Sequence, residues 1–115
     1  RRTVGARDVV WLHPAGREMT EADWQDASLG CLAVQMSGAA YSRATAEGDL
    51  LVILNVLDEP VDMHLPQASL GLGWHVVIDT AAATSETETR LMRCSEILRV
   101  GARSTLLLES RTRTT

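Results

Sequence analysis

Residues 50–56 read Leu-Leu-Val-Ile-Leu-Asn-Val, and the first five form one of the longest uninterrupted apolar runs in this 115-residue chain. Such a run has the length of a β-strand, whereas a buried helix runs to about ten residues or more. Because successive side chains of a strand point to opposite faces, both faces of this strand are apolar. The run therefore predicts a central strand that is covered on two sides.

Further short apolar runs lie on both sides of this strand, separated by turn residues. His13-Pro14-Ala15-Gly16 predicts one turn, since proline fixes one corner and glycine tolerates the other. This arrangement is typical of an all-β sandwich or barrel. The length suits one domain with one core, so we expect residues 1–115 to form a single domain. The other predicted strands are 8–12, 29–36, 61–65, 74–79, 97–100 and 105–108.

Four segments depart from the strand pattern. Thr20-Glu21-Ala22-Asp23 has the layout of a capping box, with Asp23 in the place of glutamate, and predicts one helical turn ending near residues 24–26. Segments 39–49 and 81–90 are rich in small and polar residues, which predicts mobile loops. The tail 111–115 has nothing to bury and is expected to fray.

Charge and hydropathy exclude two classes of partner. The net charge of −4 argues against nucleic acid and anionic membranes, which select a basic face, but it is compatible with uncharged sugar polymers. No apolar run approaches the roughly 18 residues that a membrane span needs. The chain begins with Arg1 and shows no basic-then-apolar leader, so we expect no secretory signal and a start at a cleavage boundary.

The two cysteines, Cys31 and Cys94, lie far apart in sequence and share no metal-type spacing with the histidines. We expect two reduced thiols, with Cys31 acting as a small core side chain. A disulfide between them stays an alternative at this point.

No residue pattern predicts catalysis, a cofactor or a metal. The sequence lacks a Gly-rich phosphate loop, Gly-x-Ser-x-Gly, His-Glu-x-x-His and Cys-x-x-Cys. His13, His64 and His75 lie in separate segments and are interpreted as exposed strand and turn residues. Glycoside hydrolysis uses a pair of carboxylates, but those in this chain fall in turns and near a helix cap. We expect structural or solvated roles for Glu21, Asp23, Asp26, Asp58, Glu59 and Asp62.

The aromatic residues are the remaining candidates for ligand contact, because indole and phenol rings stack on sugar rings. Trp11 and Trp74 lie on predicted strands, where tryptophan is usually a core residue. Tyr41 lies in the polar segment 39–49 and is the aromatic residue that we most expect to be exposed. Tyr41 and Trp24 are therefore the two candidate sugar contacts.

Three blocks of sequence, taken in order, resemble the C-terminal domain of bacterial glycogen debranching enzymes of the isoamylase type, in the α-amylase superfamily. In residues 8–24, an acidic residue and a tryptophan on a strand precede a Pro/Gly turn and then Glu18-Met19-Thr20 and Asp23-Trp24. The second and third blocks follow this one, and the resemblance covers residues 8 to about 109. They comprise residues 50–55, Glu59-Pro60-Val61, Leu65-Pro66, residues 73–80 and an apolar strand after Arg103-Ser104.

The resemblance implies an antiparallel β-sandwich of about 6–8 strands that packs against a (β/α)8 barrel of the same polypeptide. It also implies a cytoplasmic parent enzyme that cleaves α-1,6 branch points of glycogen or limit dextrin. The catalytic carboxylates of that parent lie in the barrel, so the resemblance assigns no catalytic residue and no enzyme activity to this chain alone. The implied partners are the N-terminal and barrel domains, with the α-glucan as substrate of the parent. A homodimer through an exposed face is an alternative.

Three hypotheses about function follow. A structural domain that stabilises the barrel should expose a contiguous apolar patch. An accessory glucan-binding module should expose two or three coplanar aromatic rings. An unrelated stand-alone interaction domain is the third hypothesis.

Overall fold

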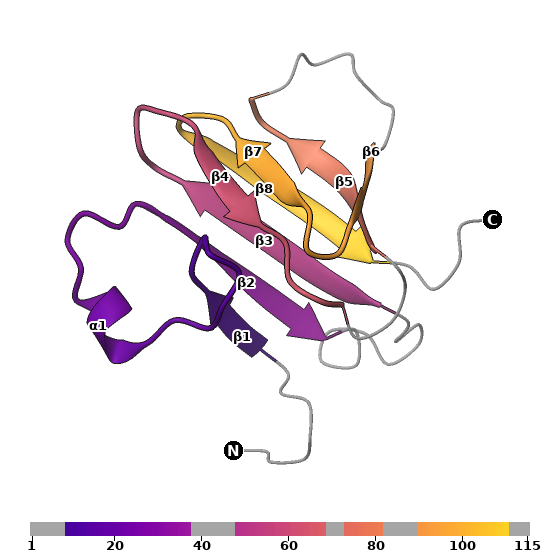
Figure 1. The fold of residues 1–115 in the computed structure, drawn as a ribbon. Coiled ribbons are helices and arrows are strands. Elements are labelled where there is room, and N and C mark those ends of the chain that lie inside the picture. Colours follow the sequence, from indigo (N-terminus) through magenta and orange to yellow (C-terminus); the bar gives the residue numbers. More distant parts are fainter. Residues whose placement is uncertain (1–8, 38–47, 69–72, 82–89, 111–115) are drawn as a thin grey trace.

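The computed structural model describes residues 9–37, 48–68, 73–81 and 90–110 (Figure 1). Within these ranges the chain forms one short helix and eight strands, which confirms an all-β fold. The elements are β1 (Val9–Leu12), α1 (Glu21–Trp24), β2 (Cys31–Ser37), β3 (Asp49–Asn55), β4 (Val61–His64), β5 (Gly73–Asp79), β6 (Arg90–Arg93), β7 (Ile97–Val100) and β8 (Ser104–Ser110). None of the described helices is long and apolar enough to cross a membrane.

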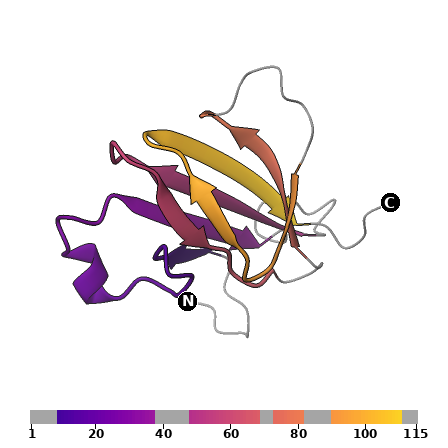
Figure 2. The same cartoon turned by 45° about the horizontal axis from the view of Figure 1, so that its top comes forward.

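The strands form two antiparallel sheets that lie one over the other. The larger sheet has the order β1-β2-β3-β8-β5-β6, and the smaller sheet consists of β4 and β7. In Figures 1 and 2 the small sheet lies over one side of the large sheet, near its middle. We call this side the inner face and the opposite side the outer face. The predicted antiparallel β-sandwich is confirmed.

The hydrophobic core lies between the two sheets. Trp74 on β5 is fully buried, and its indole Nε1–H donates to the carbonyl of Pro66 at 2.9 Å. Burial of apolar surface is the main stabilising contribution in a domain of this kind. The small sheet contributes Met63, Leu98 and Val100, and the large sheet contributes Leu12, Cys31, Ala33, Leu51, Ile53, Trp74, Val76, Leu106 and Leu108.

Buried polar side chains join the ends of the strands. Asn55 at the end of β3 is 2% exposed, and its Nδ2 donates to the carbonyls of Glu59 and Gly101, each at 3.0 Å. Its Oδ1 accepts the backbone N–H of Leu57 at 3.1 Å. Because buried polar groups without partners are costly, this side chain fixes the turn after β3 against the segment that follows β7.

The apolar run of residues 50–56 is central in the sheet but is not covered on both sides. Strand β3 pairs with β2 on one side and with β8 on the other. Its inward residues Leu51 and Ile53 are fully buried, whereas Leu54, on the outer face, is 40% exposed. The prediction of a central strand is confirmed, and the prediction of cover on two sides is wrong.

Strand β5 contains an irregularity that changes the predicted faces. Trp74 and Val76 are buried as predicted, but the register with β8 shifts between Val76 and Ile78. A bulge of this kind inserts one extra residue and turns the following side chain to the other face. Ile78 is consequently 50% exposed, whereas plain alternation along the predicted strand 74–79 places Trp74, Val76 and Ile78 on one face; for Ile78 that expectation is wrong.

Several other predictions fall partly or wholly outside the described residues. Most of segments 39–49 and 81–90, and all of the tail 111–115, lie there, so the predicted loops and fraying end stay predictions. At the margins of these segments, Asp49 is the first residue of β3 and Arg90 is the first residue of β6. Strand β6 is not among the strands predicted from the sequence. Both cysteines are free thiols, as expected, and Cys31 is buried.

Candidate functional site

The outer face of the large sheet is apolar along its centre, over five neighbouring strands. Register places the side chains of paired residues on the same face, so the pairs Trp11–Val34, Val34–Val52, Val52–Leu107 and Leu107–Ile78 form one continuous row. Two further rows flank this row, one of which contains Val9, Met36 and Leu50, and the other Leu32 and Leu54.

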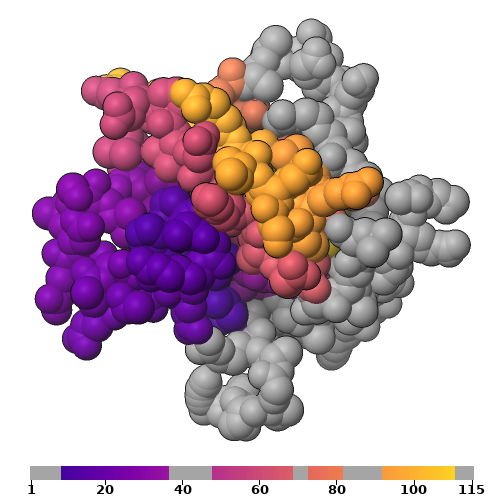
Figure 3. All heavy atoms as spheres, viewed as in Figure 1, coloured from indigo at the N-terminus to yellow at the C-terminus, as the bar shows by residue number. Residues whose placement is uncertain are grey.

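The apolar row is open to solvent at its two ends and half-buried in its middle. Trp11 at one end is 43% exposed and Ile78 at the other is 50% exposed. Apart from α1 at one edge, no described helix or strand stacks on this face, because the small sheet packs on the opposite one. The space-filling view in Figure 3 shows that opposite side, where atoms of β4 and β7 lie over the middle. The domain therefore covers one face of its large sheet and leaves the other largely uncovered.

The polar groups of the outer face lie near its margins. His75 on β5 lies opposite Glu109 on β8, and Thr105 on β8 lies opposite Leu54. Beside Leu54 and Thr105 is an open recess of about 340 Å³, which Arg103 also lines. The guanidinium of Arg103 forms an ion pair with Asp58. Polar groups at the margin of an apolar centre are the usual arrangement of protein interfaces.

One edge of the outer face carries a pair of exposed tryptophans. The rings of Trp11 on β1 and Trp24 on α1 lie edge to face, with centroids 5.7 Å apart and planes at 70°. Trp24 is 52% exposed. Trp11 was predicted to be a core residue, and this is wrong: it lies on the face of β1 that points away from the small sheet. Alternation of apolar residues identifies the two faces of a strand but not which of them is covered.

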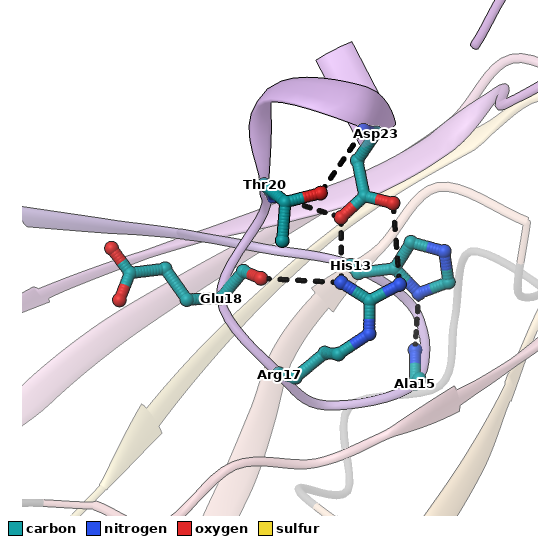
Figure 4. Close-up of polar contacts among 6 residues, drawn as sticks. All are labelled: His13, Ala15, Arg17, Glu18, Thr20 and Asp23. Atoms are coloured by element: carbon teal, nitrogen blue, oxygen red, sulfur yellow. Dashed lines mark hydrogen bonds and ion pairs between the residues drawn. The ribbon is translucent and has the colours of Figure 1, made fainter.

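The helical turn that carries Trp24 is held in place by a predicted capping box. Thr20 Oγ1 accepts the backbone N–H of Asp23 at 3.2 Å, and the Asp23 carboxylate accepts the backbone N–H of Thr20 at 2.8 Å. The same carboxylate accepts hydrogen bonds from both terminal nitrogens of the Arg17 guanidinium, at 2.6 and 3.2 Å (Figure 4). A bidentate contact of this kind restricts orientation as well as distance. We call residues 17–26 the arm.

The contact between Arg17 and Asp23 also changes their protonation equilibria. The hydrogen bond from Arg17, followed by that from the Thr20 backbone, holds the pKa of the Asp23 carboxyl far below its usual range. The same contact raises the pKa of Arg17. Both groups are therefore ionised throughout the physiological pH range, and the arm keeps this arrangement.

The connection between β1 and β2 passes around the edge of the sheet. On the inner side its turn contacts β4, where the backbone N–H of His64 donates to the carbonyl of Pro14 at 2.8 Å. Gly16 has φ +90° in this turn, and a Cβ there would lie 3.0 Å from the carbonyl oxygen of His64. The turn predicted from Pro14 and Gly16 is thus confirmed. At the outer side, the same connection places Trp24 against Trp11.

The other candidate residues are not brought together. The carboxylates Asp58 and Asp62 form ion pairs with Arg103 and Arg99, and Asp26 accepts hydrogen bonds from Ser28, which lower its pKa. His13 Nδ1 accepts the backbone N–H of Ala15 at 2.9 Å. Among the residues that the structure describes, no group of three or more histidine, cysteine or acidic side chains is placed to hold a metal ion.

The two candidate sugar contacts have different outcomes. Tyr41 lies outside the described residues. Trp24 is exposed, but its ring is inclined at 70° to that of Trp11, so the two rings do not form the coplanar platform that we expected of a glucan-binding module. A role of either residue in sugar contact stays a prediction.

Comparison with known proteins agrees with the resemblance seen in the sequence. Residues 8–113 match the family described as the isoamylase C-terminal domain. Over 108 residues, the chain is 31% identical to the glycogen operon protein GlgX homologs of Mycobacterium bovis and Mycobacterium tuberculosis strain H37Rv. This match covers 89% of the chain but only 15% of the length of each relative. The chain therefore belongs to the isoamylase C-terminal domain family.

Proposed function

We propose that this chain is the non-catalytic C-terminal domain of a cytoplasmic glycogen debranching enzyme. In this proposal the catalytic part of the same polypeptide hydrolyses α-1,6-glucosidic branch linkages of glycogen and limit dextrin. The domain contributes no catalytic residue. Its outer face packs against the (β/α)8 barrel of the parent enzyme and stabilises it.

The observation that carries this proposal is the uncovered apolar face. Strands lie about 4.8 Å apart and residues on one face about 6.8 Å apart, so the ten apolar positions of the three rows cover on the order of 300 Å² in projection. That size lies within the range of about 300–600 Å² for the largest apolar patch of a soluble monomer, a patch that is often functional. It also suits one side of an interface between domains of one chain.

The length of the relatives indicates which partner covers the outer face. Because the match spans 15% of each relative, 85% of each relative's length lies outside it. A large neighbouring part of the same polypeptide is therefore the simplest cover for the outer face. Membership of the family also argues against the hypothesis of an unrelated stand-alone domain.

The test uses the full-length polypeptide that carries this domain. Leu54→Arg and Ile78→Arg place a charge at exposed positions of the outer face, and Ile97→Arg does the same at a 52% exposed position on the small sheet. We expect the two outer-face variants to lower the calorimetric unfolding midpoint by several degrees, or to split one transition into two. Ile97→Arg should leave the midpoint unchanged.

Activity on a branched glucan separates stability from catalysis. At low temperature, where all variants are folded, the outer-face variants should retain the initial rate of branch-linkage hydrolysis. If Leu54→Arg and Ile78→Arg have the same unfolding midpoint as Ile97→Arg, the outer face is not the interface. If they are folded but inactive, the domain contributes directly to catalysis, and the proposed division of roles is wrong.

A further inference from the structure

The arm gives the outer face a projecting edge, and this feature goes beyond the packing role proposed above. The central apolar row ends at Trp11, and Trp24 continues it onto a segment outside the sheet. The two indole rings and the row therefore form one surface. Tryptophan is one of the three residue types enriched among those that dominate the energy of protein interfaces.

The rigidity of the arm is the second observation. A four-residue helix is too short to be stable alone, and no residue of α1 is buried. Its position is fixed instead by the capping box and by the bidentate contact between Arg17 and Asp23. An exposed side chain that is already ordered loses little conformational freedom on binding, so the arm is prepared for a contact.

The charge of the arm indicates the chemistry of its partner. Residues 17–26 contain one arginine and four acidic residues, a formal net charge of −3. Apart from Glu109, His75 and Arg93, the described residues that the sheet places on the outer face carry no titratable groups, and Arg93 lies on β6 at the edge opposite the arm. Arginine complements both features of the arm, because a guanidinium pairs with carboxylates and also stacks on indole rings.

We propose that Trp24 and Trp11 insert into an arginine-lined apolar recess on the neighbouring domain of the same polypeptide, and that this contact fixes how the two domains are oriented. The sheet face supplies most of the buried apolar area, and the arm supplies the specific contact. Arg17, Thr20 and Asp23 act as positioning residues, since their contacts are with one another and hold Trp24 in place. This inference rests on the proposed function.

Hydrogen exchange of the full-length polypeptide, read by mass spectrometry, tests the contact. The variants are Trp24→Ala, Trp24→Phe and, as a matched control, Ile97→Ala, since Ile97 and Trp24 are both 52% exposed. We expect Trp24→Ala to raise exchange about tenfold in one confined arginine-containing peptide of the neighbouring domain, as loss of a tryptophan that anchors an interface does. Trp24→Phe should restore most of the protection, and Ile97→Ala should have no effect.

Ionic strength gives a readout that a purely local structural role would not change. Raising NaCl from about 0.05 to about 0.5 M should increase exchange in the same peptide of the unaltered protein, because salt screens exposed charges. The Glu21→Lys variant reverses one exposed charge of the arm that has no capping role. At low salt, exchange in the same peptide should be faster in this variant than in the unaltered protein. Added salt should increase it by less.

The other outcomes separate this inference from the proposed function. If Leu54→Arg raises hydrogen exchange in the neighbouring domain but Trp24→Ala does not, the packing role stands and the proposed contact of the arm is wrong. If neither has an effect, the proposed function fails as well. Protection of the arm that requires added maltoheptaose would make it a sugar site, and protection that rises with protein concentration would make it a contact with a second copy. Either result overturns the inference.

Discussion

Two tryptophans on the same sheet allow a direct test of which face is the core. Trp74 and Trp11 both lie on strands of the large sheet, but Trp74 is fully buried on the inner face and Trp11 is 43% exposed on the outer face. Each of these two tryptophans is replaced by alanine in a separate variant. The side chains are chemically identical, so the two costs differ only through their surroundings.

The magnitudes follow from the buried area. A fully buried tryptophan removes roughly 200 Å² from water, which at about 25 cal/mol per Å² is worth about 5 kcal/mol. This agrees with the range of about 3–5 kcal/mol for removing a large aromatic ring from a core. Trp11 buries little more than half of its surface, and solvent fills the space that alanine leaves. We therefore expect a loss of at most about 3 kcal/mol for Trp11→Ala, with no added cost for a cavity.

The assay is urea unfolding of the 115-residue chain followed by far-ultraviolet circular dichroism. Small domains are stable by about 5–15 kcal/mol, so Trp74→Ala should lower the free energy of unfolding by a third or more. This decrease is large enough to measure. Trp74→Phe separates the ring from the hydrogen bond, because it keeps an aromatic side chain but removes the donor to Pro66. Its cost should be about 1–3 kcal/mol. Equal losses for the two alanine variants would refute the assignment of inner and outer faces.

Three further predictions concern single residues. Asn55→Ala should cost about 2–3 kcal/mol in the same assay, because it leaves the carbonyl of Glu59 and the N–H of Leu57 without their side-chain partner and removes one of two donors to the carbonyl of Gly101, which keeps Ser104 Oγ; a loss below 0.5 kcal/mol, roughly the noise of the method, would contradict this. At pH 8 a thiol reagent should modify Cys94 rapidly and Cys31 only after unfolding, since burial raises the pKa of Cys31 to about 11; two rapidly reacting thiols would be the opposite result. Because the pKa of Asp23 is lowered in the folded arm, its contacts stabilise the arm fully above the unfolded-state pKa of about 4, and this stabilisation is lost as pH falls further. The near-ultraviolet dichroism of the tryptophan pair should therefore persist at pH 4 and decline toward pH 2. In Asp23→Asn this decline between pH 4 and pH 2 should be absent.

Much of the fold could be predicted from local patterns in the sequence. The capping box at Thr20 and Asp23 depends on residues three positions apart, and residues 61–65 show plain alternation of apolar and polar side chains. Strand β6 was missed because Arg-Leu-Met-Arg has only two apolar residues and lies at the edge of the sheet, paired with β5 alone. The bulge in β5 was missed because its register is set by β8, which is distant in sequence.

The candidate site could be predicted only in part, for a related physical reason. The sequence shows that residues 50–56 are apolar on both faces, and this is compatible with cover by the domain itself or by a neighbour. It was interpreted as cover within the domain. Trp11 was predicted to be a core residue because a tryptophan on a strand is usually buried, and the sequence does not say which layer buries it. The pairing of Trp11 with Trp24 depends on how the arm turns back around the sheet edge, which the Pro14–Gly16 turn permits but does not determine.

The incomplete layering of this domain explains why a neighbour is needed. A sheet buries at most one face against a single second layer, and here that layer has only two strands of four residues each. Packing on the inner face is sufficient to form a core, as the full burial of Leu51 and Ile53 shows. It contributes nothing to Leu54 or Ile78 on the other side of the same sheet. A third layer would therefore remove from water the apolar rows that the fold leaves exposed. Because a flat apolar face alone tolerates several orientations of a partner, the projecting tryptophan pair is what would select one of them.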